Sequence, residues 1–295
     1  MKIKTTSDGV NLNYWQEEDK WEELAASARK KFYKWLNLQP GLVILEVGCG
    51  SGRNLVDMSK IIQPNGKVVG LDIAKAHAKA AQEFVNQSPY KDLIEVYLGD
   101  INEFSDQPIY DLIWIKNTLQ HLPDPLQSLK QMVILLKPGG RVAVLEDAEC
   151  YWLPFDLVSG NNDKIYLYYR NAVFKYYIQL QDSKKEKTKK VRYNTTLAGL
   201  FQKLKLNQIQ LKTVTINEIP PLSEPMKAVL ELYLNNPPLE RLRKYLPNDV
   251  YKNLEPLWDK SAPTYLLKRK DLYIRKSYTC LVATNPKLYN KIRKE

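Results

Sequence analysis

The chain has 295 residues, of which 44% are hydrophobic, and this is enough for a large packed core. The composition excludes a disordered protein. The first residues, MKIKTTSDGVN, lack the apolar segment of a signal peptide, and no apolar run approaches the roughly 18 residues needed to cross a bilayer. We therefore expect a soluble cytoplasmic protein.

The charge is unevenly distributed. The net charge is +11, and residues 1–150 carry 17 basic and 20 acidic side chains, whereas residues 151–295 carry 27 and 13. The first part is therefore −3 and the second +14. Such asymmetry indicates either an anionic partner, namely nucleic acid or a membrane surface, or a set of solvated lysine-rich faces, and we favour the latter.

The cysteines do not predict a cross-link or a metal. Cys49, Cys150 and Cys280 are an odd number and have no paired spacing. This pattern argues against a disulfide framework and against a zinc site, so no metal is expected. Cys49 is predicted to fill a small position in a glycine-rich turn.

Residues 42–147 alternate short apolar runs with longer amphipathic ones. In order, these are VILEV, NLVDMSKII, VVGLDI, AKAAQEFV, LIEVYL, YDLIWIK, PLQSLKQMVILL and RVAVLE. The pattern predicts strand, helix, strand, helix, strand, strand, helix and strand. Near-continuous apolar strands separated by helices are typical of a parallel sheet covered on both faces.

The flanking segments predict helices and two further strands. Apolar residues at helical spacing in residues 14–37 predict a helix over the mouth of the sheet. Residues 197–206 are predicted as a helix, and residues 209–216 and 277–284 as strands. The roughly 60 residues between these strands far exceed a hairpin loop, so they form part of a cap. Its helices are expected near 226–235, 239–246 and 249–259.

A glycine-rich turn follows the first strand, and its residues narrow the range of possible ligands. The dinucleotide fingerprint would place its third glycine at position 53, which is Arg53, and the lysine of a phosphate-binding P-loop is also missing. The pattern is instead Glu46-x-Gly48-x-Gly50-x-Gly52. A carboxylate before the glycines would repel a phosphate, so the turn suits a cationic or hydroxyl-rich ligand.

Two more carboxylates end the following strands. Asp72 could accept hydrogen bonds from the 2′ and 3′ hydroxyls of a ribose, and Asp100 from an adenine amino group. Parallel strands present their carboxyl ends at one edge of the sheet, where ligands of open α/β folds bind. We therefore expect Glu46, Asp72 and Asp100 to surround one ligand.

These stretches together resemble the class I S-adenosylmethionine-dependent methyltransferases, most closely the branch of quinone-biosynthesis and natural-product enzymes. The matching stretches span about residues 35–150 and are EVGCGSG, GLDI, LGDI, YDLIWIKNTLQHLPDP and LLKPGGRVAVLED. The resemblance implies a Rossmann-like seven-stranded α/β sheet with an antiparallel last strand and helical cap insertions. It also implies S-adenosylmethionine as cofactor, bound by Glu46, Gly48, Gly50, Gly52, Asp72, Ile73, Asp100, Ile101 and Asn117.

The domain organisation follows from this fold. We predict an N-terminal helical lid at 1–40, the cofactor-binding core at 41–150, a cap insertion at 151–193, a core helix and strand at 194–217, a second cap insertion at 218–270, and the last strand with a basic tail at 271–295. So much cap predicts a small acceptor that is enclosed during turnover.

Candidate catalytic and acceptor-binding residues lie after the fourth and fifth strands. His121 is the candidate general base, and Glu146 and Asp147 are further candidates, while the second histidine, His77, is expected at the surface. Carboxylates beside aromatic rings can hold an ammonium or guanidinium group. The candidate acceptor-binding residues are Glu149, Trp152, Tyr166 and Tyr169. Methylation of an amine or guanidine nitrogen in specialised metabolism is therefore favoured.

Two other acceptor classes remain open. A phenol, quinone or lipid would be methylated on oxygen or carbon, and a basic cap could sit on a membrane surface. RNA could be held by the basic second part, but the chain lacks both the Asn/Asp-Pro-Pro-aromatic stretch that grips a flipped base and a Pro-Cys nucleophile. The sequence does not fix the oligomeric state.

Overall fold

The computed structural model describes residues 12–107, 109–154, 161–183, 197–235 and 238–286. Within these ranges, no helix combines the length and apolar character needed to cross a membrane. Residues 184–196, which include the end of the predicted cap insertion, and the basic tail beyond residue 286 lie outside the described residues.

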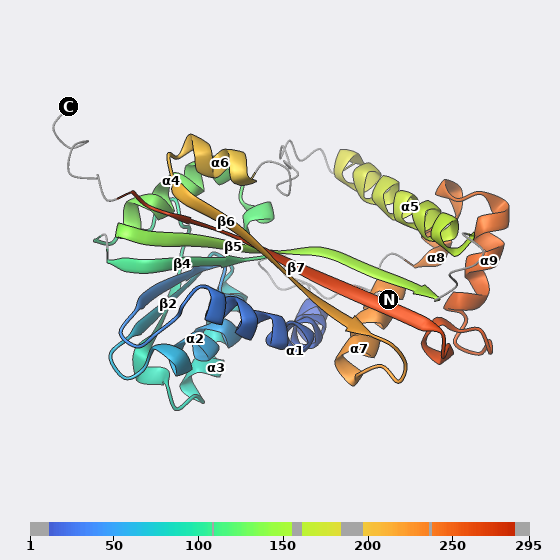
Figure 1. Cartoon of the computed structure of the whole chain (residues 1–295), viewed down its shortest axis with the longest axis horizontal. Helices are drawn as coiled ribbons and strands as arrows, with labels where there is room; N and C mark the ends of the chain where they lie inside the picture. Colours follow the sequence, from blue (N-terminus) through green and yellow to red (C-terminus); the bar gives the residue numbers. More distant parts are fainter. Residues whose placement is uncertain (1–11, 108, 155–160, 184–196, 236–237, 287–295) are drawn as a thin grey trace.

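One seven-stranded sheet forms the frame of the molecule, in the order β3-β2-β1-β4-β5-β7-β6 (Figure 1). The strands are β1 Val43–Val47, β2 Lys67–Asp72, β3 Ile94–Leu98, β4 Tyr110–Lys116, β5 Leu136–Pro154, β6 Asn207–Glu218 and β7 Leu272–Thr284. β1 to β5 are parallel, and β7 runs antiparallel to both β5 and β6. The predicted sheet with its antiparallel last strand is confirmed.

Helices cover both faces of the parallel strands. The helices of the core are α2 Arg53–Ile62, α3 Lys75–Asn86, α4 Pro125–Leu135 and α6 Leu197–Lys203. In Figure 1, α2 and α3 lie below the sheet and α4 and α6 above it. Leu55 and Val85 join the hydrophobic cluster on the first face, and Leu129 and Phe201 the cluster on the second. The continuous apolar strands of the sequence are buried because both faces are covered.

β5 is longer than the sequence pattern predicts. The apolar run RVAVLE suggests an end near residue 147, but the strand continues to Pro154, which pairs with Leu272 of β7. A bulge between Asp147 and Glu149 interrupts the register there. Cross-strand pairing with β7 sustains this extension, and pairing of that kind is invisible to a search for apolar alternation.

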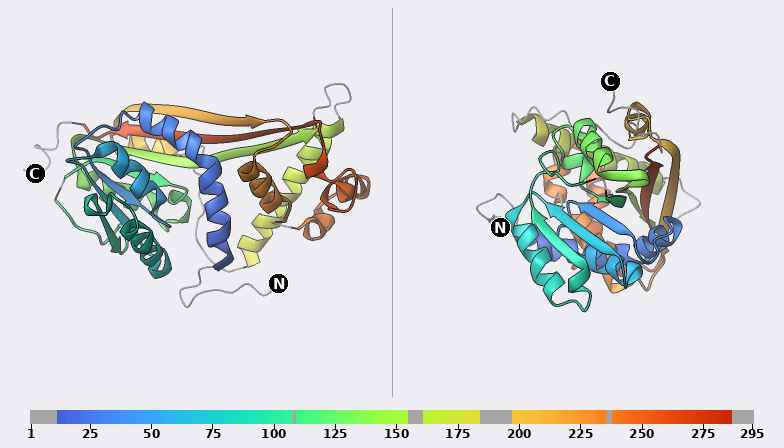
Figure 2. Two further views of the ribbon diagram at one scale, coloured as in Figure 1. Left: turned by 90° about the horizontal axis from the view of Figure 1, so that it is seen from below. Right: turned by 90° about the vertical axis from the view of Figure 1, so that its left-hand side faces the viewer.

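A second group of helices packs around the extended strands. These helices are α5 Asn161–Ser183, α7 Glu224–Asn235, α8 Leu239–Leu242 with the 3-10 turn η4 Arg243–Tyr245, and α9 Asn248–Trp258. They surround a third hydrophobic cluster that includes Tyr169, Met226 and Leu254 (Figures 1 and 2). The cap helices expected near 226–235, 239–246 and 249–259 are therefore present.

The N-terminal helix α1, Leu12–Trp35, connects the two bodies. Its Phe32 is buried in the cluster of the core, and its Leu24 in the cluster of the cap helices. Figure 2 shows α1 running from the sheet past the edge of the core toward the cap side. The helix therefore lies where the sequence places it, across the opening at the strand ends.

Candidate functional site

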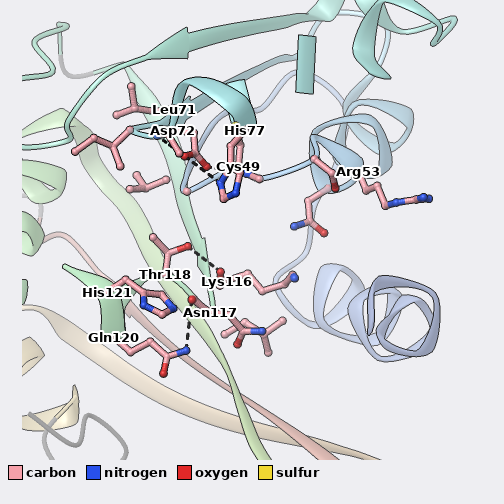
Figure 3. Close-up of a pocket in the computed structure, with 18 of the residues that line it drawn as sticks. Cys49, Arg53, Leu71, Asp72, His77, Lys116, Asn117, Thr118, Gln120 and His121 are labelled. Carbon is pink, nitrogen blue, oxygen red and sulfur yellow. Dashed lines mark hydrogen bonds and ion pairs between the residues drawn. The ribbon is translucent and has the colours of Figure 1, made fainter. Parts of the chain in front are cut away.

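A cavity of about 900 Å³ opens at the carboxyl ends of the parallel strands (Figure 3). Its wall is formed by the glycine-rich turn after β1, the ends of β2 and β4, the start of α3 and one side of α1. Cavities that enclose small ligands have volumes of roughly 300 to 1,000 Å³. This cavity can hold a nucleoside-sized ligand and a second small molecule beside it.

The turn between β1 and α2 depends on glycine. Gly48, Gly50 and Gly52 have φ values of 74°, 52° and 80°, a region that other residues rarely adopt. A Cβ atom on Gly48 would lie 2.2 Å from Oγ1 of Thr118, so only glycine fits against this residue. The turn is therefore a surface of bare backbone that a ligand can approach.

Asp72 ties this turn to the end of β2. Its Oδ2 accepts a hydrogen bond from the Gly50 amide at 2.9 Å, and its Oδ1 accepts one from the Ala74 amide at 2.9 Å. The side chain is 6% exposed and lines the cavity. A carboxylate has about four acceptor positions, so acceptor capacity remains for a ribose hydroxyl even beside His77, whose Nδ1 lies 3.4 Å from Oδ1.

The ends of β2 and β3 form a slot suited to a planar base. Ile73 lines the cavity yet is 70% exposed, and Ile101 is buried in the opposite part of the wall. Oδ1 of Asp100 accepts hydrogen bonds from the backbone amide and the side-chain amide of Asn102, each at 2.9 Å. These bonds orient the carboxylate at the edge of the slot. A base placed there would cover the exposed face of Ile73.

Asn117 shapes the end of β4. It has a left-handed φ of 51°, and its amide donates to the carbonyl of Leu145 in β5. The next residue, Thr118, donates its hydroxyl to the Lys116 carbonyl at 2.9 Å. Asn117 and Thr118 both line the cavity, and the part of Asn117 in cofactor binding stays a prediction.

Glu46 lies beneath the glycine turn and is fully buried. Oε1 accepts a 2.6 Å hydrogen bond from the side-chain amide of Asn54, while Oε2 has no hydrogen-bond partner among the described residues. Burial raises the pKa of Glu46 to about 8, and the bond from Asn54 only partly offsets this rise. The group is therefore neutral at pH 7 in this environment.

A buried ionic cluster joins α1 to β4. Glu22 of α1 pairs with Arg29 at 2.7 Å and with Lys116, whose side chain extends from β4 toward α1 in Figure 3. Arg29 also contacts Asp57 of α2 at 3.0 Å. Burial alone would raise the pKa of Glu22, but Lys116 and Arg29 together hold it below its usual value. Glu22 is thus ionised at neutral pH, whereas the raised pKa of Glu46 favours its neutral form.

The two histidines both lie in the cavity wall. His121 stands in the 3-10 turn after β4 and is exposed, as expected for a group at the entrance. His77, expected at the surface, lies instead in the first turn of α3, with its Nδ1 3.4 Å from Oδ1 of Asp72. The sequence pattern missed this contact because the turn after β2 brings the helix back over the strand end.

The far end of the cavity is aromatic and backed by a lysine. Trp21 of α1 and Tyr278 of β7 line the wall, and Nζ of the buried Lys276 lies 5.0 Å and 5.2 Å from the centres of their rings. Cations at such distances are attracted by aromatic faces. The ammonium group of Lys276 therefore already occupies the position that a cationic ligand would seek.

The other predicted site residues are less close to the cavity. Glu146 lies in β5 opposite Thr279 and does not line the cavity, and Tyr169 is buried in the cap cluster, where it packs against Trp258 at 5.2 Å. The side chains of Asp147, Glu149, Trp152 and Tyr166 lie outside those that the structure describes. Their proposed roles remain predictions.

The residues that the sequence analysis missed are Glu22, Arg29, Lys116 and Lys276. One signal was available: Glu22 and Arg29 stand seven residues apart on a helix whose apolar residues predict packing, and charges on a buried face require partners. Their partners come from strands far along the chain. Helical periodicity alone could not identify them.

Taken together, these groups fit S-adenosylmethionine. The donor set consists of two carboxylates for the nucleoside, an apolar slot for the base, bare backbone in the glycine turn, and a charged corner at α1. The exposed Ile73 is a feature that a ligand would cover. Glu46 does not line the cavity, and its predicted part in donor binding stays a prediction. Among the described side chains, no cluster of three or more His, Cys, Asp or Glu residues could hold a metal ion.

Comparisons with known proteins agree with this geometry. The family described as "Methyltransferase domain" matches residues 38–203. The demethylmenaquinone methyltransferase of Desulfitobacterium hafniense (strain Y51) is 30% identical over 138 residues, which are 43% of this chain and 54% of that protein. The demethylmenaquinone methyltransferase of Lactobacillus johnsonii is 32% identical over 123 residues, 41% of this chain and 50% of that protein. The chain spans about half the length of these curated relatives.

A solved structure of similar extent comes from Bacillus halodurans. This putative methyltransferase aligns over 87% of this chain and 98% of its own, with 16% sequence identity and a TM-score of 0.49.

We predict that replacing Glu46 by Gln changes the pH dependence of stability. The folded pKa of about 8 exceeds the usual 4.5, so the stabilising contribution of the protonated group is complete below pH 4.5 and is lost as the pH rises through 8. Glu46→Gln should therefore match the wild type near pH 5 and exceed it at pH 8.5 by a few kcal/mol, since each pKa unit corresponds to about 1.4 kcal/mol. Urea unfolding at both pH values measures this difference. A stability gap that does not change with pH would contradict the neutral assignment.

Proposed function

The chain belongs to the methyltransferase domain family, and from this premise we propose that it transfers a methyl group from S-adenosylmethionine to a small acceptor held beneath α1. The observation that carries the proposal is the bonding of Asp72, which joins the glycine turn to the end of β2 and still has acceptor positions directed at the cavity. When bound, S-adenosylmethionine supplies an electrophilic methyl group on a positively charged sulfur.

The protein binds the donor through complementary groups at successive strand ends. Asp72 accepts hydrogen bonds from the ribose hydroxyls, Asp100 accepts from the adenine amino group, and Ile73 and Ile101 flank the base. The glycine turn admits the amino-acid end of the donor close to the main chain, beside Arg29 and Lys116 of the α1 corner. This arrangement fixes the direction from which an acceptor must approach.

Positioning and exclusion of water are the main tasks of the remaining wall. Trp21, Ala25 and Ala28 of α1 lie over the cavity, and Leu145 and Tyr278 close its far end. Holding two reactants in line can contribute about 7 to 11 kcal/mol to the lowering of a barrier. Enclosure under a helix favours a small acceptor over a macromolecule.

His121 is proposed as a general base only for an acceptor that is protonated at working pH. It is exposed at the entrance, where a released proton can reach water. Asp147 remains a secondary candidate for catalysis, whereas Glu146 does not line the cavity.

The finer proposal of a nitrogen acceptor depends on carboxylates near the end of the parallel core. Asp147 and Glu149 would hold an ammonium or guanidinium group, with Trp152 and Tyr166 beside them. These roles are predictions from the sequence, and they would suit an amine or guanidine substrate of specialised metabolism.

A second candidate, a hydroxyl or carbon acid such as a phenol or quinol, is favoured by Lys276. Its ammonium group lies over the rings of Trp21 and Tyr278 and disfavours a second cation at the far end of the cavity, whereas it would attract an electron-rich or anionic ring. The curated relatives named as demethylmenaquinone methyltransferases support this candidate.

An acceptor panel distinguishes these classes. The whole chain is incubated with methyl-labelled S-adenosylmethionine and separate pools of amines and guanidines, phenols and quinols, and RNA. Label in the first pool supports nitrogen, and label in the second supports oxygen or carbon. Label that enters only RNA would overturn the small-molecule proposal.

We predict that Asp72→Ala abolishes measurable donor binding. The change removes both ribose hydrogen bonds and the support of the Gly50 amide, and charge-assisted bonds contribute about 1.5 to 3 kcal/mol each, so affinity should fall at least a hundredfold. Calorimetry with S-adenosylhomocysteine measures it. Asp92→Ala, which removes an exposed carboxylate, serves as the matched control and should bind normally. Equal affinity of the two variants would contradict the ribose assignment.

We predict that His121→Ala lowers turnover about a hundredfold and removes the acidic limb of the pH profile, because general-base catalysis contributes roughly 10²- to 10⁴-fold. Donor affinity should be unchanged, which separates a chemical role from a binding role. His77→Ala is the matched histidine control and should alter donor affinity instead, since His77 contacts Asp72. If His121→Ala leaves the pH profile intact, the residue is not the base.

A further inference from the structure

One side of α5 exposes large apolar side chains. Leu167 is 58% exposed, Tyr168 37% and Phe174 42%, and the neighbouring Asn171 and Lys175 are exposed as well. Leu167, Asn171 and Phe174 follow at spacings of four and three residues, which place them on one side of a helix, with Tyr168 and Lys175 next to them. These five residues are called the α5 face.

The opposite side of the helix fixes this orientation. Tyr169 and Ala172 are buried in the cap cluster, and Val173 and Tyr176 pack against it. Tyr169 contacts the ring of Trp258 in α9. The helix therefore cannot rotate to bury Leu167 and Phe174 without withdrawing Tyr169 and Ala172 from the core.

Basic side chains border the α5 face. Among the described side chains of α5, the charged ones are Arg170 and Lys175, and both are exposed. The neighbouring η4 adds the exposed Lys244, which bonds to the exposed Gln179 of α5, whereas Arg241 of α8 bonds to Tyr176 on the opposite side of the helix. Arg243 is exposed beside them, and Glu240 is the acidic side chain of the same turn.

This combination has the chemistry of a helix that lies on an anionic lipid surface. Such helices bury apolar side chains among the lipid chains and keep Lys and Arg at the headgroups. The charge of +14 in residues 151–295 complements an anionic membrane. An exposed aliphatic side chain such as Leu167 would not contribute to the recognition of a nucleic acid. Figure 1 shows α5 along the outer side of the cap, away from the parallel core.

We propose that the α5 face docks the protein reversibly on the surface of an anionic lipid bilayer. Arg170, Lys175 and Lys244 contact the lipid headgroups, and Leu167, Tyr168 and Phe174 enter the boundary with the acyl chains. A single short face of this kind gives weak association that depends on lipid charge and salt. The proposal is independent of the methyl acceptor.

Vesicle co-sedimentation of the whole chain tests the proposal. Vesicles of phosphatidylcholine alone are compared with an equimolar mixture of phosphatidylcholine and phosphatidylglycerol at low salt. We expect binding to the mixed vesicles and at least a tenfold weaker interaction with phosphatidylcholine. Raising the salt concentration should weaken binding to the mixed vesicles. Equal binding to both vesicle types would overturn the assignment of the charged residues.

Two variants and a matched control separate the α5 face from general stickiness. The double substitutions Leu167→Ser with Phe174→Ser, and Lys175→Gln with Lys244→Gln, should each weaken binding to the mixed vesicles at least tenfold. Leu211→Ser in β6 removes a side chain of comparable exposure, 64%, and should bind like the wild type. Thermal unfolding and binding of S-adenosylhomocysteine check that every variant is folded.

Other outcomes of these experiments would contradict the proposal. Vesicle binding that survives both double substitutions, or that Leu211→Ser reduces equally, would overturn the assignment to α5. Release of the protein from vesicles by inorganic phosphate at matched ionic strength would identify a free-phosphate site instead of a bilayer surface. Binding of single-stranded RNA that depends on Lys175 and Lys244, without vesicle binding, would identify a nucleic acid surface.

Discussion

The carboxylate of Asp72 is the constraint around which the donor half of the molecule is arranged. It accepts one amide hydrogen bond from the glycine turn and another from the start of α3, so it fixes two chain reversals with one side chain. The amides of Gly48 and Cys49 add bonds to the carbonyl of Leu71 beside it. Because these bonds form between chain segments, the cavity is preorganised before any ligand contributes.

Two carboxylates near the same cavity have different charge states because their surroundings differ. Glu46 is buried with one amide donor and has a raised pKa, whereas Glu22 is equally enclosed but faces Arg29 and Lys116. A buried ion pair contributes little net stability, since desolvation offsets its attraction, but losing one partner is costly. The Glu22 cluster therefore makes the position of α1 specific: the helix is held in one register against β4.

Much of the core follows from local patterns, while the polar contacts of the site do not. The apolar runs predict the strands and helices of the core, and the glycine-rich turn and the carboxylates at the strand ends predict the donor-binding edge. The extension of β5 to Pro154 depends on pairing with residues more than a hundred positions away, and the approach of Lys116 to Glu22 joins residues 94 positions apart. His77 reaches Asp72 only because α3 folds back over the strand, which no residue period encodes.

The joint between the two bodies is where donor and acceptor binding can influence each other. α1 buries Phe32 in the core cluster and Leu24 in the cap cluster, and just before Leu24 its Trp21 and Glu22 contact Lys276 of β7 and Lys116 of β4. A packed interior resists continuous deformation. A movement of the cap therefore either moves these charged contacts with it or breaks them. Because Trp21, Glu22 and Lys116 also line the cavity, a ligand that strengthens their contacts also holds the cap against the core.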